Sequence, residues 1–135
     1  MTIKEFFKDD RYAVHSGIEL LEVKPGFARA QMKIEDMHLN AGNVVQGGAI
    51  FTLADLAFAA AVNAYGNLAV SIESNIRFFK GESSGILYAE AQLVHIHTKL
   101  ATFEVRVTNE AEELISLFSA TAYRKQIPLP FDEQP

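Results

Sequence analysis

The chain has 135 residues, of which 49% are hydrophobic and 21% charged, and its formal net charge is -5. We expect one domain over residues 1–127, followed by a disordered, acidic and proline-rich tail at 128–135. The negative charge and the lack of a basic stretch argue against nucleic acid as the main partner. The absence of cysteine excludes disulfides, thiolate metal ligands and cysteine nucleophiles.

We expect a cytoplasmic protein with no membrane partner. The first ten residues are charged and hold no signal-peptide apolar region. The apolar run 49–62 is shorter than the roughly 20 residues needed to span a bilayer.

The N-terminal third predicts a helix followed by a hairpin. Glu5–His15 carries apolar residues among charges, as in a short amphipathic helix. Ile18–Val23 and Phe27–Ile34 predict two strands joined by the turn Pro25-Gly26, and the second strand alternates polar and apolar residues. Met37–Gln46 lacks periodicity and predicts a loop.

The remainder predicts a buried helix and a set of strands. Gly47–Tyr65 is rich in Ala and Leu and apolar on nearly every face. Four strands follow, with connections short enough for antiparallel pairing, at Ala69–Lys80, Ile86–His97, Ala101–Thr108 and Leu114–Arg124. The fold class is therefore α+β, in the order α-β-β-α-β-β-β-β. One antiparallel sheet wraps one long apolar helix, which a second subunit can help to cover.

Asp55 is the only Asp, Glu, Lys or Arg between Asp36 and Glu73. A carboxylate inside an apolar helix is costly to bury and needs a partner, a proton or a chemical role. The structural alternative is a hydrogen bond to Thr52, one turn back, or to a neighbouring backbone group. The chemical alternative is a catalytic carboxylate.

Gly47 and Gly48 open the same helix, where the first N–H groups lack intrahelical partners. Such an end can hold a developing oxyanion, and glycine lets a carbonyl approach closely. The alternative is a steric requirement of the turn. Asp55 lies seven residues after Gly48, roughly 10 Å along the helix axis, so both groups can serve one carbonyl only if they come from different subunits.

Other polar residues support less specific interpretations. Asn40 can hold a carbonyl or a water, or simply form a turn. His95 and His97 share one strand face, but no third ligand is close in sequence, so we expect no metal. Ser71 and Ser74 lack an obvious His–Asp pair, which argues against a serine triad.

The stretch 38–59 reads HLNAGNVVQGGAIFTLADLAFA and resembles the signature of hotdog-fold acyl-CoA thioesterases of the phenylacetate-degradation (PaaI-type) family. Members typically show Asn, a short loop, His-Gly-Gly, an apolar stretch and Leu-Ala-Asp in the central helix. The resemblance covers most of the chain, because the order of elements is also that of the hotdog fold. It implies an acyl-CoA substrate, no separate cofactor, and a homodimer or dimer of dimers.

The resemblance also implies roles for particular residues. Asp55 matches the catalytic carboxylate, a general base or a nucleophile, and Gly47 matches the glycine whose N–H polarises the thioester carbonyl. Asn40 matches the asparagine that holds the carbonyl or the water, and Ser71 matches a serine that assists the water in some members. Gln46 stands where many members have His, and glutamine cannot carry a proton near neutral pH.

Substrate-binding residues are expected in three groups. Beside the helix start they are Gly48 and Thr52. For an acyl pocket they are Leu53, Leu56, Phe58, Phe78 and Phe79, whose alternative is the core. For CoA phosphates they are Arg77, Lys80, Lys99 and Arg124, each of which can equally be a solvated strand-end charge.

Two other functions compete with thioester hydrolysis. A hydroxyacyl-thioester dehydratase of this fold pairs an acid with a histidine, and no histidine stands at the glycine motif. A non-catalytic acyl-CoA-binding protein stays open because of Gln46.

Overall fold

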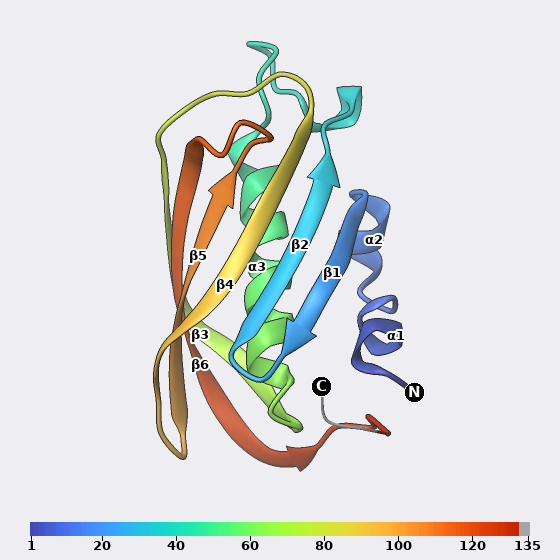
Figure 1. Ribbon diagram of the computed structural model, residues 1–135, viewed down its shortest axis with the longest axis vertical. Coiled ribbons are helices and arrows are strands. Elements are labelled where there is room, and N and C mark those ends of the chain that lie inside the picture. Colours follow the sequence, from blue (N-terminus) through green and yellow to red (C-terminus); the bar gives the residue numbers. More distant parts are fainter. Residues whose placement is uncertain (133–135) are drawn as a thin grey trace.

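A computed structural model describes residues 1–132 and shows one antiparallel sheet curved around a long central helix (Figure 1). The sheet has six strands in the order β1-β2-β4-β5-β6-β3. Their bounds are β1 Ile18–Lys24, β2 Phe27–Lys33, β3 Asn67–Phe78, β4 Ile86–Ile96, β5 Leu100–Thr108 and β6 Leu114–Pro128. This is the α+β hotdog arrangement expected from the sequence.

The central helix α3 spans Gly47–Asn63 and lies against the concave face of the sheet. Its small side chains let the strands approach closely, and four alanines have no exposed surface: Ala54, Ala57, Ala60 and Ala61. Phe58 fills the space between helix and sheet, with its ring edge-on to Phe103 at 5.6 Å between centroids. The predicted buried helix is confirmed, and it ends two residues earlier than expected.

Strand alternation places the predicted apolar faces inward. Ala28, Ala30 and Met32 of β2 are fully buried, while Arg29 and Gln31 between them are partly exposed. The inward residues of β5 are likewise buried: Phe103, Val105 and Val107. These period-2 patterns therefore identified the core correctly.

The N-terminal segment differs from the single helix expected over Glu5–His15. It forms two short helices, α1 at Ile3–Phe7 and α2 at Arg11–His15, so the prediction was wrong here. The break occurs at Asp10, whose carboxylate accepts a hydrogen bond from the Ala13 N–H at 3.1 Å and starts α2. Both helices lie beside β1, at one edge of the sheet (Figure 1).

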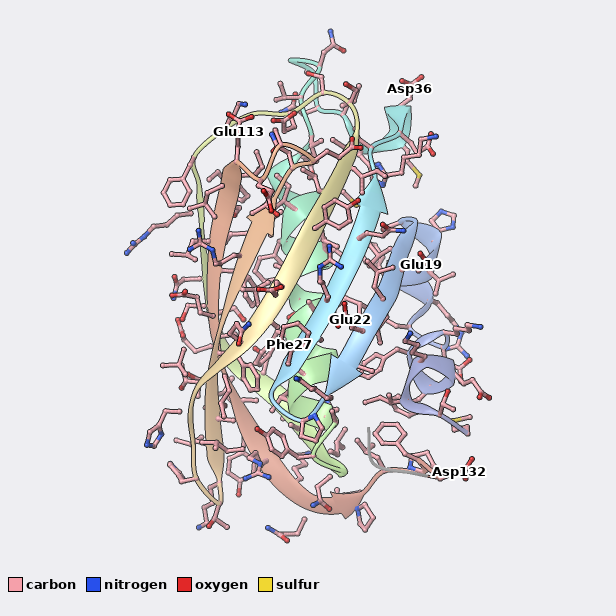
Figure 2. All side chains as sticks on the ribbon, in the orientation of Figure 1. Glu19, Glu22, Phe27, Asp36, Glu113 and Asp132 are labelled. Carbon is pink, nitrogen blue, oxygen red and sulfur yellow. The ribbon has the colours of Figure 1, made fainter. Side chains whose placement is uncertain are left out.

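The opposite edge of the sheet is β3, which pairs with β6 rather than with its sequence neighbour β4. A connection over residues 79–85 carries the chain from this edge across to β4, at the end of the molecule where α3 begins (Figure 1). Asp36 and Glu113 mark the same end in Figure 2, and Asp132 lies at the opposite end.

The first residue of the tail expected at 128–135, Pro128, is the last residue of β6. Beyond it, the Leu129 N–H donates to the Gly66 carbonyl at 2.9 Å and the Asp132 N–H donates to the Met1 carbonyl at 2.9 Å. Residues 133–135 lie outside the described part of the chain. Among the helices of residues 1–132, none combines the length and apolar character of a membrane span.

Candidate active site

Asp55 lies on the one stripe of α3 that neither the sheet nor the N-terminal helices fully cover. Gly48, Thr52, Asp55 and Ala59 follow one another at helical spacing, and each is partly or fully exposed. The neighbouring Ala54 and Leu56 are buried. The fold therefore presents this carboxylate at a surface bordered by apolar side chains.

The carboxylate of Asp55 accepts no hydrogen bond from any donor within residues 1–132. Thr52, the structural partner considered from the sequence, donates instead to the Gly48 carbonyl at 2.8 Å. Burial raises the pKa of Asp55 above its ordinary 3.8, and the nearby charge of Asp10 raises it further. A carboxylate held in this way is a better base when ionised, and it is free to meet a ligand.

The start of α3 offers free backbone donors. Gln46 is the N-cap residue, its side chain makes no capping hydrogen bond, and its carbonyl accepts from the Ala49 N–H at 3.0 Å. The N–H groups of Gly47 and Gly48 have no acceptor within the described residues, as expected for the first helical turn. Positive potential at this helix end suits a developing oxyanion.

Both glycines also have a steric reason to be glycine. A Cβ on Gly47 would lie 2.9 Å from Cζ of Phe78, and a Cβ on Gly48 would lie 2.7 Å from Oε1 of Gln46. The chemical and steric interpretations of the glycine pair therefore coexist. Phe78 and the Gln46 side chain crowd the helix start without hydrogen-bonding its N–H groups.

Asn40 shapes the loop that leads into α3. Its Oδ1 accepts from the Gly42 N–H at 2.8 Å and from the Val44 N–H at 3.3 Å. This is the turn role considered from the sequence. Only the Nδ2 group of Asn40 stays without an acceptor in residues 1–132, so any contact with a substrate would use that donor.

Ser71 lies on the edge strand β3, opposite Ala122 of β6. The Ala122 side chain is buried on the face of the sheet that holds α3. Because side chains of directly paired residues lie on the same face, Ser71 points to that face too. Its hydroxyl lies 3.0 Å from the hydroxyl of Ser74. The two hydroxyls form a small polar group on the strand that borders the exposed stripe of α3.

The cations expected to bind CoA phosphates are scattered. Arg77 is exposed on β3, opposite Leu117 on the outer face of the sheet. Lys99 lies in the β4–β5 hairpin, and its carbonyl accepts from the N–H of Arg124 on β6 at 2.7 Å. This hairpin lies at the end of the molecule where α3 ends, away from the helix start (Figure 1). Lys80 is nearer the helix start, where its Nζ lies 2.6 Å from Glu113 Oε1.

Arg124 also has partners within the protein. It donates to the His97 carbonyl at 2.8 Å, and its guanidinium lies 5.2 Å from the centroid of the Tyr65 ring. These contacts give it a structural role at the hairpin. A role in phosphate binding is therefore less supported for Arg124 than for the exposed Lys99 and Arg77.

Phe58 does not line the surface, contrary to its assignment as a substrate-binding residue. It is 2% exposed and packs between Phe103 and Phe118 in the core. Its ring contacts with Phe103 of β5 and Phe118 of β6 hold it against the sheet. Phe78 and Phe79 are 51% and 54% exposed, and the Phe78 ring lies against Gly47 at the helix start.

The two strand histidines lie side by side at the β4–β5 hairpin. The ring centroids of His95 and His97 are 6.0 Å apart, and His97 Nδ1 accepts from the Lys99 N–H at 3.2 Å. In the part of the chain that the structure describes, no group of three or more His, Asp or Glu side chains gathers as a metal site.

One residue near the site escaped the sequence analysis. His38, the last residue of the short helix η1 at Asp36–His38, is 4% exposed and hydrogen-bonded through both ring nitrogens. Its place at the head of the glycine motif was the only available signal. Of its two partners, Glu35 lies three residues before it and Ser16 lies 22 residues before it, and periodicity reveals neither contact.

The sequence profile of the thioesterase superfamily matches residues 42–116, which include the start of α3 and Asp55. The chain belongs to the thioesterase superfamily. It is 42% identical to a protein of Archaeoglobus fulgidus named "Putative esterase", over 95% of this chain and 84% of that protein. It is 30% identical to the acyl-coenzyme A thioesterase PaaI of Escherichia coli, over 87% of this chain and 85% of that protein.

The solved structure of the Escherichia coli PaaI protein matches with a TM-score of 0.88 at 28% identity, covering 92% of this chain and 91% of that one. The expected hotdog fold and PaaI-type family are thereby confirmed. The chain is an enzyme of the thioester-hydrolase class.

Proposed function

We propose that this thioesterase hydrolyses acyl-CoA thioesters to a carboxylic acid and free CoA, with Asp55 as the catalytic carboxylate. The observation that carries the proposal is the presence on α3 of two groups that have no hydrogen-bond partner within residues 1–132. These are a partly buried carboxylate without a donor and a helix start with free N–H groups. The similarity to the acyl-coenzyme A thioesterase of Escherichia coli supports CoA thioesters as the substrate class. No separate cofactor is required, and the cytoplasm, where CoA is abundant, is the compartment we propose.

The chemistry divides between the two ends of the site. The Gly47 N–H, at the positive end of α3, receives the thioester oxygen and stabilises the negative charge that develops on it. Asp55 acts on the other side of the carbonyl carbon. Asn40 and Ser71 contribute a free amide donor and a hydroxyl, for the carbonyl and for the water respectively.

Two routes conserve atoms and charge. As a base, Asp55 takes a proton from water, the water oxygen bonds to the carbonyl carbon, and the C–S bond breaks. The proton then passes to the departing thiolate. As a nucleophile, Asp55 forms an anhydride with the acyl group as the thiolate leaves, and water cleaves that anhydride. A single turnover in ¹⁸O water that yields unlabelled acid would identify the nucleophile route, in which water attacks the Asp55 carbon of the anhydride and the product keeps an Asp55 oxygen.

Gln46 cannot be the group that carries protons at the site. It can orient a carbonyl or a water through its amide, but it cannot accept a proton near neutral pH. Asp55 therefore performs all proton transfer at the site in this proposal. Gln46 is exposed at the helix start and folds over Gly48, where it can contact the substrate.

The site is completed by a second copy of the chain. Asp55 and the start of its own helix are too far apart to act on one carbonyl, since each residue adds about 1.5 Å along the axis. The outer edge of β3 has no partner strand within residues 1–132, and Val70 and Ile72 on it are 38% and 58% exposed. Pairing of two β3 edges covers these residues and brings the exposed stripes of two α3 helices together. Two such dimers then form the tetramer expected from the family resemblance.

A panel of acyl-CoAs tests the activity directly. Release of the CoA thiol is measured for aromatic, short aliphatic and medium-chain acyl groups. Asp55→Ala and Asp55→Asn are expected to lower kcat by about 10²- to 10⁴-fold, the usual contribution of a general base. Asp9→Asn, which removes an exposed carboxylate elsewhere, is the control and should leave kcat unchanged.

Three results would contradict the proposal. Unchanged hydrolysis in both Asp55 variants would remove Asp55 from the mechanism. Tight binding of acyl-CoAs without thiol release by the wild type would favour a non-catalytic binding protein. Loss of water from a hydroxyacyl-CoA would favour a dehydratase.

A further inference from the structure

The His38 side chain is buried near the start of α3 and hydrogen-bonded through both ring nitrogens. It is 4% exposed, although it belongs to the loop region that leads into the helix. With Gln46 and Thr52 it also lines a cleft of about 320 Å³ beside α2. A buried histidine at this place needs partners for both ring nitrogens.

Both partners are present, and they determine the ring's protonation. The Glu35 N–H donates to Nδ1 at 2.9 Å, so Nδ1 carries no proton. Nε2 lies 2.7 Å from the Ser16 carbonyl, which can only accept, so Nε2 carries the proton. The two hydrogen bonds therefore favour the Nε2–H tautomer and occupy both ring nitrogens.

The backbone of His38 connects the ring to the helix start. Its N–H donates to the Glu35 carbonyl at 3.0 Å, and its carbonyl accepts from the Gln46 N–H at 2.7 Å. Ser16 is the C-cap residue of α2, and Gln46 is the N-cap residue of α3. One residue thus links the end of α2, the turn at Glu35 and the residue before Gly47.

We propose that His38 is a positioning residue that holds the Gly47 N–H in place for the thioester oxygen. This rests on the proposed function of Gly47. The ring fixes His38 between α2 and Glu35, and the His38 carbonyl then sets the position of Gln46 and of the peptide that follows. Catalytic donors must be held closely, since a misplacement of about 1 Å can cost about 10²-fold in rate. His38 transfers no proton in this role, because both of its nitrogens are occupied.

Isosteric variants test each ring contact separately. In His38→Asn the side-chain oxygen can replace Nδ1 and accept from Glu35. In His38→Gln the side-chain amide can replace Nε2 and donate to Ser16. His38→Ala loses both contacts, while the backbone bond to Gln46 is available in every variant. His95→Gln, which removes an exposed histidine at the far hairpin, is the matched control.

A positioning role predicts a specific kinetic pattern. His38→Ala should lower kcat by about 10- to 100-fold with KM changed by less than about threefold, because the oxyanion contact is made mainly in the transition state. The Asn and Gln variants should each recover part of the loss, and His95→Gln should match the wild type. If His38→Ala fails to fold, the comparison of Asn and Gln with the wild type still decides. Equal kcat in folded Asn and Gln variants and wild type would overturn the proposal, as would a loss confined to KM.

A second measurement does not depend on activity. Nitrogen-15 NMR of the wild type should show the neutral Nε2–H tautomer of His38. Amide hydrogen exchange at Gln46 and Gly47 should accelerate in the His38 variants and not in His95→Gln. If the wild type proves inactive on thioesters, the proposed function fails while these readouts still report on positioning. The other tautomer, or unchanged exchange in all His38 variants, would overturn the positioning role itself.

Discussion

Asp10 connects the N-terminal helices to the candidate catalytic carboxylate. Its side chain caps α2 by accepting from the Ala13 N–H, and its negative charge raises the pKa of Asp55 on α3. The larger cause of that raised pKa is burial of Asp55, and the charge of Asp10 adds to it. The segment that replaced the single expected helix therefore tunes the site electrostatically.

The variant Asp10→Asn should shift the acid limb of the activity profile to lower pH. Asparagine keeps an oxygen for the Ala13 N–H, so α2 stays capped while the charge is lost. The pKa of Asp55 then falls toward its ordinary value, and the base stays ionised at lower pH. The measurement is kcat/KM against pH for wild type and variant.

Asp9→Asn is the control for this shift, because it removes a neighbouring exposed carboxylate that does not contribute to the raised pKa of Asp55. Its profile should coincide with that of the wild type. A profile of Asp10→Asn that coincides with the wild type as well would show that the acid limb belongs to another group.

Removing the charge of Asp55 should stabilise the protein at neutral pH. The unfolded chain releases the Asp55 proton near pH 3.8, whereas the folded chain holds it to higher pH because the pKa is raised. Stability is therefore lost as pH rises through the raised pKa, and the ionised carboxylate destabilises the fold at pH 7. Asp55→Asn removes this penalty. Since Asp55 is partly exposed, we expect a gain of about 1 kcal/mol or less, or a few degrees in Tm.

Calorimetry at fixed protein concentration checks the sign. Tm of Asp55→Asn should exceed that of the wild type at pH 7, and the difference should shrink as the pH falls to about 4 and below, where the wild-type carboxyl is protonated too. A lower Tm of the variant at pH 7 would mean that the ionised carboxylate stabilises the fold, in conflict with its raised pKa.

Local patterns predicted the parts of the fold that depend on neighbours in sequence. The alternation in β2 identified Ala28 and Met32 as core residues, and the apolar texture of 47–65 identified the buried helix. The capping residue Asp10 was visible in the sequence, and it could have shown that the first helix breaks there. The periodicity of apolar residues thus predicted most of the helices and strands.

Long-range pairing could not be predicted in the same way. β3 and β6 are neighbours in the sheet, although β4 and β5 lie between them in the sequence. No local pattern distinguishes this pairing from a pairing of β3 with β4. The same limit applies to side chains. From the sequence, Arg124 was a candidate cation for phosphate, and the structure shows its contacts with His97 and Tyr65. His38 fell near a predicted loop, and the structure shows its ring hydrogen-bonded to the Glu35 N–H. Each role depends on partners that only the folded chain brings close.

Mixed dimers test whether the site is shared between chains. Gly47→Ala places a Cβ against Phe78 and in the path of the thioester oxygen, and we expect kcat to fall by about 10²-fold, the scale for one oxyanion donor. Asp55→Ala removes the carboxylate. Each variant alone is inactive, but a mixed dimer has one site with both groups intact. Random mixing should recover about a quarter of the wild-type activity per chain.

The mixing experiment requires folded parents, shown by circular dichroism and by an unchanged Tm after mixing. Recovery should need exchange of subunits, so mixing without unfolding and refolding is the control and should stay inactive. No recovery after confirmed exchange would place Asp55 and Gly47 of one site in the same chain, against the axial distance argued above.

The edge strand β3 provides the last prediction, which concerns assembly. Ile72 is 58% exposed on the unpaired edge, and a charge there should prevent two β3 edges from pairing. Ile72→Lys is therefore expected to yield monomers by analytical ultracentrifugation and to lower kcat by about 10²-fold or more, because each site then lacks its second half. Val94→Lys is the matched control, since Val94 is 63% exposed but lies on the interior strand β4. A monomeric Ile72→Lys protein with full activity would contradict the shared site, and an unchanged oligomer would contradict pairing through β3.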